Sequence, residues 1–170
     1  MAWNGIVAVD GSFGIGRNGT LPWRHKADLS QFRRKTTGGI VVMGGSTFRS
    51  IGRPLAHRVN VVLSSTIDPR ELGTAVKGIA HVARNAREAE AVVANICEGA
   101  QCPPSVWVIG GAEIYKLFHD KIKTWHVTLV KGEYHCDRSI IPYWLDQERY
   151  REDTCNVLDD RASVTVYSSK

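Results

Sequence analysis

The sequence lacks the features that mark membrane, secreted and metal-binding proteins. No apolar run approaches the ~20 residues that a membrane-spanning helix requires, and the first four residues lead into a strand-like run rather than a secretion signal. The four cysteines contain no Cys-x-x-Cys pair, and the six histidines lack zinc-ligand spacing. We therefore expect a cytoplasmic protein with reduced thiols, no metal site and no membrane partner.

Strong charge and internal repetition are also missing. The net charge is +5 over 170 residues, and basic residues cluster only at 24–26 and 33–35. Runs this short are typical of solvated helix faces, so no nucleic-acid partner is expected, although the mild positive balance suits a small polyanionic ligand. The length fits a single domain over residues 1–170.

Short hydrophobic runs alternate with helical patterns along most of the chain. Strands are expected at 6–9, 39–43, 59–63, 79–82 and 106–109, and helices at 48–51, 86–97 and 112–118. Because these strands are hydrophobic on both faces, they indicate a parallel sheet with helical crossovers. Two later runs, 125–130 and 163–167, have no long helix between them and indicate an antiparallel edge. The predicted fold class is α/β: three layers, with a mostly parallel mixed β-sheet flanked by about four helices and an antiparallel C-terminal edge.

Asp28 is the candidate functional carboxylate. It stands near Trp23, Leu29 and Phe32, and four-residue spacing puts Asp28 and Phe32 on one side of a helix. A buried carboxylate needs hydrogen-bond donors, and a flat heterocycle with an amino group and a ring N–H supplies two. The alternative is a capping box, Asp28-x-x-Gln31, in which Asp28 only satisfies helix amides. The residues around Asp28 leave both alternatives open.

The glycine pattern at residues 14–19 is a weak match to a dinucleotide fingerprint. It reads Gly-x-Gly-x-x-Gly, but Pro22 disfavours the helix that a Rossmann fingerprint requires directly after it. We interpret these glycines as part of a flexible loop, residues 11–20, that acts as a lid over a site.

Two other glycine pairs stand where a strand gives way to a helix. They are Gly44 with Gly45 and Gly110 with Gly111, and Ser64 ends another strand. Helix starts expose unpaired N–H groups that bind anions, so two of them on one sheet predict a site for a pyrophosphate-linked dinucleotide. For either pair alone, tight packing of a helix on a sheet is the alternative interpretation.

Four ordered motifs resemble the dihydrofolate reductase family. They are Leu21-Pro22-Trp23 with Asp28, Leu29 and Phe32; Val42-Met43-Gly44 with Thr47-Phe48 and Ser50-Ile51-Gly52-Arg53-Pro54-Leu55; Arg58 with Asn60-Val61-Val62-Leu63-Ser64; and Val108-Ile109-Gly110-Gly111 with Ile114-Tyr115. The resemblance runs from about residue 6 to residue 128. It implies NADPH-dependent reduction of 7,8-dihydrofolate to 5,6,7,8-tetrahydrofolate, by hydride transfer from nicotinamide C4 to pterin C6 with protonation of N5. It also implies a role in one-carbon metabolism and thymidylate synthesis, and binding of antifolate inhibitors to a monomer.

The resemblance also implies roles for residues around the substrate. Asp28 would bind the pterin 2-amino group and N3, Thr128 would join that network, Trp23 would hold an ordered water, and Arg58 would pair with the α-carboxylate of the substrate's glutamate. Together with Leu21, the residues Asp28, Trp23 and Thr128 would form the catalytic set. The pocket would be lined by Ile6, Val7, Leu29, Phe32, Ile51, Leu55, Ile109 and Tyr115.

A second set of residues would hold NADPH, with an adenosine-binding subdomain at roughly 39–97. Around the nicotinamide we expect Ala8, Ile15, Gly16, Gly19, Leu21, Ile109 and Tyr115. Around the pyrophosphate and ribose we expect Gly44, Gly45, Ser46, Thr47, Gly110, Gly111, Ala112, Glu113 and Ile114, with the Gly110–Gly111 bond cis. On the adenosine side we expect Leu63, Ser64, Ser65 and Arg84.

Two departures from the family pattern bear on the cofactor. Gly45 stands where many relatives have a basic residue that contacts the 2′-phosphate, and Glu113 puts a carboxylate where some have Arg. We therefore expect a narrower preference for NADPH over NADH. Two other functions remain as alternatives: a reductase of the same fold that acts on a ribosylated pyrimidine in riboflavin synthesis, and a non-catalytic ligand-binding or nucleic-acid-binding domain.

Overall fold

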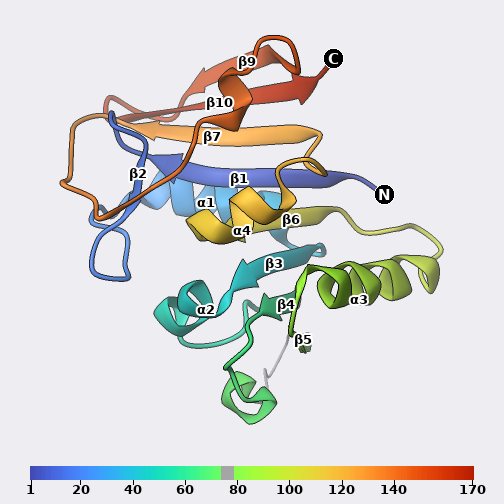
Figure 1. Cartoon of the computed structure of the whole chain (residues 1–170). Coiled ribbons are helices and arrows are strands. Elements are labelled where there is room, and N and C mark those ends of the chain that lie inside the picture. The colour runs from blue at the N-terminus through green and yellow to red at the C-terminus, as the bar shows by residue number, and fades with distance from the viewer. Residues whose placement is uncertain (74–78) are drawn as a thin grey trace.

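The computed structural model describes residues 1–73 and 79–170, and a mixed sheet forms its centre (Figure 1). The main sheet has the strand order β5-β4-β3-β6-β1-β7-β10-β9, and β2 and β8 form a separate pair. The strands are β1 (Trp3–Val9), β2 (Gly14–Gly16), β3 (Ile40–Gly44), β4 (Val59–Leu63), β5 (Ile79–Ala83), β6 (Val106–Gly110), β7 (Thr124–Val130), β8 (Arg138–Ser139), β9 (Tyr150–Val157) and β10 (Ala162–Ser169). The helices are α1 (Lys26–Thr36), α2 (Gly45–Ile51), α3 (Ala86–Glu98) and α4 (Ala112–Phe118), with 3-10 turns at Pro69–Leu72 and Tyr143–Leu145.

The strands from β5 to β7 in this order, β5-β4-β3-β6-β1-β7, are all parallel, and the two pairings that follow are antiparallel. β1 lies between β6 and β7 and is parallel to both, while β10 pairs antiparallel with β7 and with β9. The predicted mixed sheet with an antiparallel C-terminal edge is thus confirmed.

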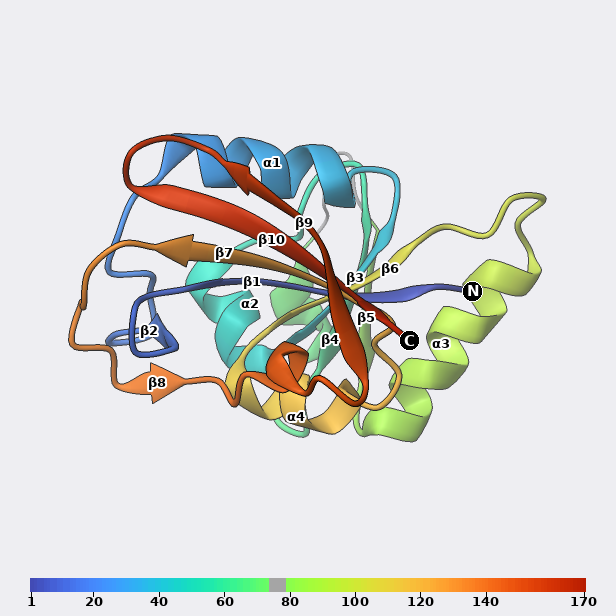
Figure 2. The same ribbon diagram turned by 90° about the horizontal axis from the view of Figure 1, so that it is seen from above.

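Helices cover both faces of the sheet (Figure 2). Phe48 of α2 and Phe32 of α1 belong to one apolar cluster, and Val93 of α3 and Phe118 of α4 belong to the other. Strand β3 is fully buried because it is covered from both sides. The chain moves outward from β1 to β5 and then returns to β6, so the carboxyl ends of β3, β6 and β1 meet where the direction of winding changes. Open α/β sheets bind ligands at this point.

The elements predicted from hydrophobic runs are all present within the described residues, with small shifts at their ends. Strand β9, the outer neighbour of β10, was not predicted, because it is exposed along nearly its whole length and has no hydrophobic face. The loop at 11–20 is also more structured than expected, since it contains β2. No helix of the described residues is long and apolar enough to cross a membrane, and all four cysteines are unpaired thiols.

Candidate active site

Asp28 lies in the first turn of α1 and is buried, with 8% of its surface exposed. Its Oδ1 accepts hydrogen bonds from Thr128 Oγ1 at 2.6 Å and from Gln31 Nε2 at 3.0 Å. The capping-box alternative is wrong: His25 is the N-cap of α1, and the Asp28 amide donates to His25 Nδ1. The carboxylate is therefore held by side chains from α1 and β7 rather than used to cap its own helix.

Gln31 was not predicted as a site residue. Its Nε2 also donates to Thr128 Oγ1 at 2.9 Å, so Asp28, Gln31 and Thr128 form a closed triangle of hydrogen bonds. The amide orientation follows from this contact, because the reverse orientation would place two oxygens 3.0 Å apart. Gln31 Oε1 is buried without a hydrogen-bond partner among the described residues. The sequence signal for Gln31 is its three-residue spacing from Asp28, and this spacing is equally typical of a helix cap.

Trp23 lies in the segment that precedes α1 and packs with Val130 and Ala162. It is 7% exposed, and its ring centroid lies 5.2 Å from that of Tyr134. Its Nε1 is buried and no described residue accepts a hydrogen bond from it. A buried N–H without a protein acceptor needs another partner, such as an ordered water.

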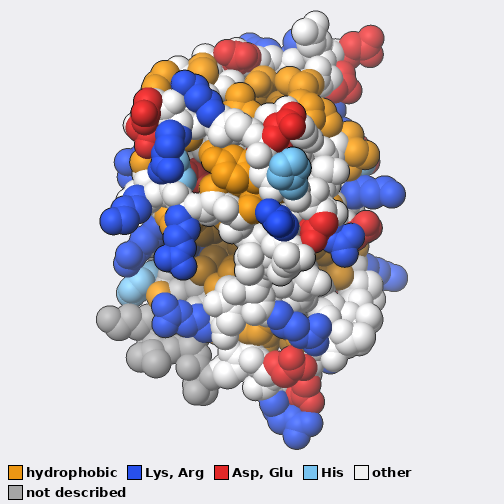
Figure 3. Space-filling model, turned by 90° about the vertical axis from the view of Figure 1, so that its left-hand side faces the viewer, with side chains coloured by type: hydrophobic (Ala, Val, Ile, Leu, Met, Phe, Trp, Pro, Cys, Tyr) orange, Lys and Arg blue, Asp and Glu red, His pale blue; other side chains and the backbone are white. Residues whose placement is uncertain are grey.

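The surface next to Asp28 is apolar. Ile6 is 5% exposed and lies in one cluster with the half-buried Phe32, Leu55 and Ile109. The face at the carboxyl ends of the strands has a hollow lined by hydrophobic side chains, with Lys and Arg side chains gathered along one side (Figure 3).

Other residues expected in the pocket wall have different environments. Val7 points to the opposite face from Ile6, so only its main chain can contact a ligand that rests on Ile6. Leu29 and Ile51 are exposed, which places them at a rim rather than a floor.

Arg58 stands at the other end of α1 from Asp28. It is 8% exposed; its Nε donates to Ala56 O at 2.8 Å and its Nη1 to Thr36 Oγ1 at 3.0 Å. Burial and the neighbouring charge of Arg33 lower the pKa of Arg58, but a guanidinium remains charged in proteins. Thr36 lies eight residues after Asp28, so about 12 Å of helix separates Asp28 from the residue that Arg58 contacts. A ligand that contacts both must be elongated, with donors at one end and a carboxylate at the other.

The two glycine pairs lie side by side at the carboxyl ends of adjacent strands. Met43 of β3 is in register with Gly110 of β6, and the Gly110–Gly111 bond is cis, as predicted. Gly44 and Gly111 are the N-caps of α2 and α4, and neither helix has a side-chain cap. By contrast α1 and α3 are capped by side chains. The first-turn amides of α2 and α4 are therefore left to other acceptors.

Residues expected around the nicotinamide differ in their burial. Tyr115 is 3% exposed and donates to Ile6 O at 2.7 Å. Burial, with the charge of Asp28, raises the pKa of Tyr115 far above its usual value, so the phenol stays neutral. Ile15 is half-buried against the core, Ala8 packs near Trp23, and Leu21 is exposed.

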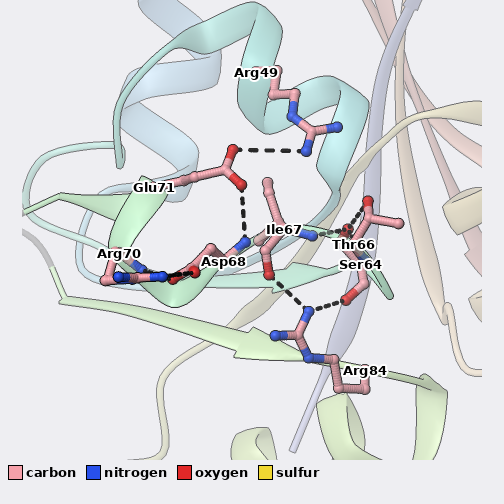
Figure 4. Close-up of polar contacts among 8 residues, drawn as sticks. All are labelled: Arg49, Ser64, Thr66, Ile67, Asp68, Arg70, Glu71 and Arg84. Carbon is pink, nitrogen blue, oxygen red and sulfur yellow. Dashed lines mark hydrogen bonds and ion pairs between the residues drawn. The ribbon is translucent and has the colours of Figure 1, made fainter.

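The loop that follows β4 is held by Arg84 (Figure 4). Arg84 Nη1 donates to Ser64 O at 3.1 Å and to Ile67 O at 2.7 Å. Ser64 Oγ accepts from the amides of Thr66 and Ile67. The guanidinium and the Ser64 hydroxyl thus already serve the fold of this loop.

Gly45 is constrained by the same loop. A Cβ atom at this position would approach Ser64 Oγ to 3.0 Å and Ser64 Cβ to 3.1 Å. The absence of a basic side chain at 45 therefore matches the close packing of Ser64. Ser46, Ser65 and Glu113 are exposed.

The 11–20 loop is docked on residues 133–139. β2 pairs with β8, Asn18 N donates to Asp137 Oδ2 at 2.9 Å, and Asp137 N donates to Gly16 O at 3.0 Å. Gly14 is essential to this contact, because a Cβ there would lie 2.5 Å from Cys136 Cβ.

A doubly wound sheet with a buried carboxylate near the carboxyl ends of its strands defines the α/β class that binds ligands at that edge. Comparison with known proteins narrows the class. The dihydrofolate reductase family model matches residues 3–166, so the chain belongs to the dihydrofolate reductase family.

Individual relatives agree with the family assignment. Dihydrofolate reductase from Bacillus subtilis is 34% identical over 134 residues, covering 78% of this chain and 71% of the relative. The Staphylococcus aureus enzyme is 29% identical over 159 residues, covering 94% and 90%. A solved structure of dihydrofolate reductase from Enterococcus faecalis, complexed with NADP(H) and RAB-propyl, superposes with a TM-score of 0.76 at 22% identity, covering 99% of this chain and 96% of that one. This last likeness bears on the fold alone.

Proposed function

We propose that this chain reduces 7,8-dihydrofolate to 5,6,7,8-tetrahydrofolate with NADPH. The observation that carries the proposal is the pair of buried charges at the two ends of α1, Asp28 and Arg58, beside an apolar floor. The spacing suits a substrate with a pterin at one end and a glutamate carboxylate at the other. Family membership supports the same activity.

The residues around Asp28 bind and orient the pterin in this proposal. Thr128 and Gln31 both donate to Oδ1, so the other carboxylate oxygen, Oδ2, is left to accept from the substrate. Trp23 Nε1 holds an ordered water beside it. The negative charge of Asp28 favours the protonated form of N5 during reduction.

The uncapped first turns of α2 and α4 fit a pyrophosphate, which needs several unpaired amides at once. Thr47 and the residues after Gly111 would hold NADPH, and the adenosine would lie against Leu63 and Ser65. When bound, the cofactor supplies the hydride that passes from nicotinamide C4 to pterin C6. The 11–20 loop excludes water from the site when it is docked.

The proposal is tested by following nicotinamide absorbance with purified protein, NADPH and dihydrofolate. Absorbance should fall only when all three are present, and a diaminopyrimidine antifolate should stop the fall. Arg58→Gln should raise KM for dihydrofolate far more than it lowers kcat, because a charge-assisted pair is worth about 1.5–3 kcal/mol. No reaction with dihydrofolate, but oxidation of NADPH by a ribosylated aminopyrimidine, would assign the chain to the alternative reductase.

We also propose that the preference for NADPH over NADH is narrow. Gly45 offers no side chain, Glu113 repels phosphate, and Arg84 is partly engaged by the carbonyls of Ser64 and Ile67. One arginine contact corresponds to a ratio of kcat/KM values of about 10 to 100. Arg84→Gln should bring this ratio close to one, whereas a wild-type ratio above about 1,000 would contradict the proposal.

Two further points belong to the proposal: the protein works as a monomer in the cytoplasm, and residues 39–97 form the adenosine-binding part of one domain. Sedimentation at micromolar concentration checks the monomeric state.

A further inference from the structure

His25 is a buried histidine that contacts two distant parts of the chain. It is 3% exposed and forms the N-cap of α1. Its Nδ1 accepts a hydrogen bond from the Asp28 amide at 3.1 Å, and its Nε2 lies 2.8 Å from Asp159 Oδ2. Asp159 belongs to the turn between β9 and β10. One imidazole ring therefore joins the C-terminal hairpin to the turn that carries the candidate catalytic carboxylate.

The hydrogen bond from the Asp28 amide determines the tautomer of His25. Because the Asp28 N–H points at Nδ1, that nitrogen must present a lone pair. The proton of the neutral ring then lies on Nε2, which is 2.8 Å from Asp159 Oδ2 but outside hydrogen-bond geometry. A carboxylate partner of this kind commonly fixes the tautomer and orientation of a histidine.

Asp159 is itself fixed by its turn. Its Oδ1 accepts from the amides of Arg161 at 2.8 Å and Ala162 at 3.1 Å. The His25 contact and the Arg161 amide hold the pKa of Asp159 below its ordinary value. An asparagine could not replace it, because an amide has one acceptor oxygen, and its NH₂ group would face either the N–H groups of the turn or the N–H of His25.

The same hairpin leads to Thr128. Ala162 is in register with Val130 of β7, and Val164 is in register with Thr128. The contact between Asp159 and His25 therefore fixes the position of the first turn of α1 relative to β7. This is the position at which Asp28 accepts the 2.6 Å hydrogen bond from Thr128.

We propose that His25 and Asp159 are positioning residues for Asp28: Asp159 fixes the His25 ring, and His25 fixes the turn of α1 from which Asp28 reaches the substrate. This inference rests on the proposed function. It assigns a role to the turn between β9 and β10 and makes substrate affinity, rather than cofactor affinity, the property that depends on it.

The first test needs no variant and no catalysis. Nitrogen-15 NMR of the histidine rings in the wild-type protein at neutral pH should show His25 protonated on Nε2, with Nδ1 accepting a hydrogen bond. A proton on Nδ1 would overturn the proposal. This readout stands even if dihydrofolate turns out not to be the substrate, so the two failures can be told apart.

The second test compares Asp159→Asn with Asp160→Asn, which removes the same charge from an exposed neighbour in the same turn. Asp159→Asn should weaken binding of dihydrofolate or a diaminopyrimidine antifolate by roughly 3- to 30-fold, the range for loss of a helix cap, with NADPH affinity unchanged within about twofold. Asp160→Asn should leave both affinities unchanged. Equal effects of the two variants, or an equal fall in NADPH affinity, would overturn the proposal.

The third test separates helix capping from the link to Asp159. His25→Asn retains a side-chain acceptor for the Asp28 amide but is too short to reach Asp159, whereas His25→Ala loses both contacts. His25→Asn should bind dihydrofolate better than His25→Ala and worse than the wild type. Adding Asp159→Asn to His25→Asn should weaken binding no further, and additive losses would contradict the link.

Discussion

Thr128 Oγ1 donates a hydrogen bond of 2.6 Å to Asp28 Oδ1, across 100 residues of sequence. The bond joins β7 to the first turn of α1 and so makes the carboxylate part of the sheet's geometry. Because Gln31 donates to the same oxygen, the direction of the carboxylate is set before any ligand binds. Preorganised groups of this kind lower the reorganisation that a reaction requires.

Asp28→Asn should slow dihydrofolate reduction by ~10²–10⁴-fold near neutral pH, the range usual for acid–base assistance. The substitution removes the charge that, in the proposed mechanism, favours protonation of N5, and it keeps the size of the side chain. Single-turnover measurement of the hydride-transfer step checks this, and an unchanged melting temperature would show that folding is intact. Near-normal turnover would remove Asp28 from the mechanism.

Gln31→Glu should destabilise the protein by about 2–4 kcal/mol at pH 7, because it places a second carboxylate about 3 Å from Asp28 Oδ1. The loss should shrink toward pH 5, where one proton can be shared by the pair. Gln31→Leu is the control: it removes a donor to Asp28 but also removes the unpartnered Oε1, so its stability should change by less than about 1 kcal/mol. Urea unfolding at both pH values measures this, and equal stability of the two variants at pH 7 would contradict the placement of Gln31.

Gly14→Ala should undock the 11–20 loop, because the new Cβ would lie 2.5 Å from Cys136 Cβ. We expect kcat to fall about 10-fold or more, with dihydrofolate affinity less affected, because under the proposal the loop excludes water during transfer. Arg17→Ala is the control in the same loop, because Arg17 is exposed and has no assigned part in ligand binding. Similar kcat values for the two variants would argue against a lid.

His126 should make the fold sensitive to acid. Burial and the charge of Lys35, whose Nζ donates to His126 Nδ1 at 2.9 Å, lower the pKa of His126 to about 4 from the ordinary value of 6.5. The unfolded chain therefore binds the proton first: stability is complete above about pH 6.5 and falls as pH drops toward 4. The difference between these two pKa values corresponds to a loss of unfolding free energy of at most about 3 kcal/mol. The actual loss is smaller because the site is partly exposed to solvent.

His126→Gln keeps an acceptor for Lys35 and removes the titration. Urea unfolding between pH 7 and 4.5 measures the free energy of unfolding of both proteins. As the pH falls, the wild type should lose stability relative to His126→Gln. A difference that is constant over the interval would contradict the lowered pKa.

Much of the fold was predictable because buried parallel strands read as unbroken hydrophobic runs. The positions of β3, β4 and β6 followed from such runs, and the glycine pairs at their ends marked the starts of α2 and α4. β9 could not be found in this way, since an exposed strand at the edge of a sheet has no buried face to leave a pattern.

The site residues whose role depends on their own chemical type were predictable from the sequence. Those whose role depends on contacts with distant parts of the chain were not. Asp28 was singled out because a carboxylate among apolar residues needs a partner, and its contact with Thr128 is present as expected. The spacing of Gln31 from Asp28 is also typical of a helix cap, and His25 lies in a short basic run. Their roles depend on Thr128 and on Asp159, which lie about 100 and 130 residues away in the chain, and no local pattern encodes such distances.

The exposed strand β9 limits how the sheet can grow. Its free edge carries Arg151, Glu152 and Asp153 in succession. A strand from another molecule that added here would have to place its own side chains beside this mixed row of charges, which lose hydration without matched partners. The exposed, charged character of β9, which leaves no hydrophobic pattern in the sequence, thus also protects the sheet against edge-to-edge aggregation.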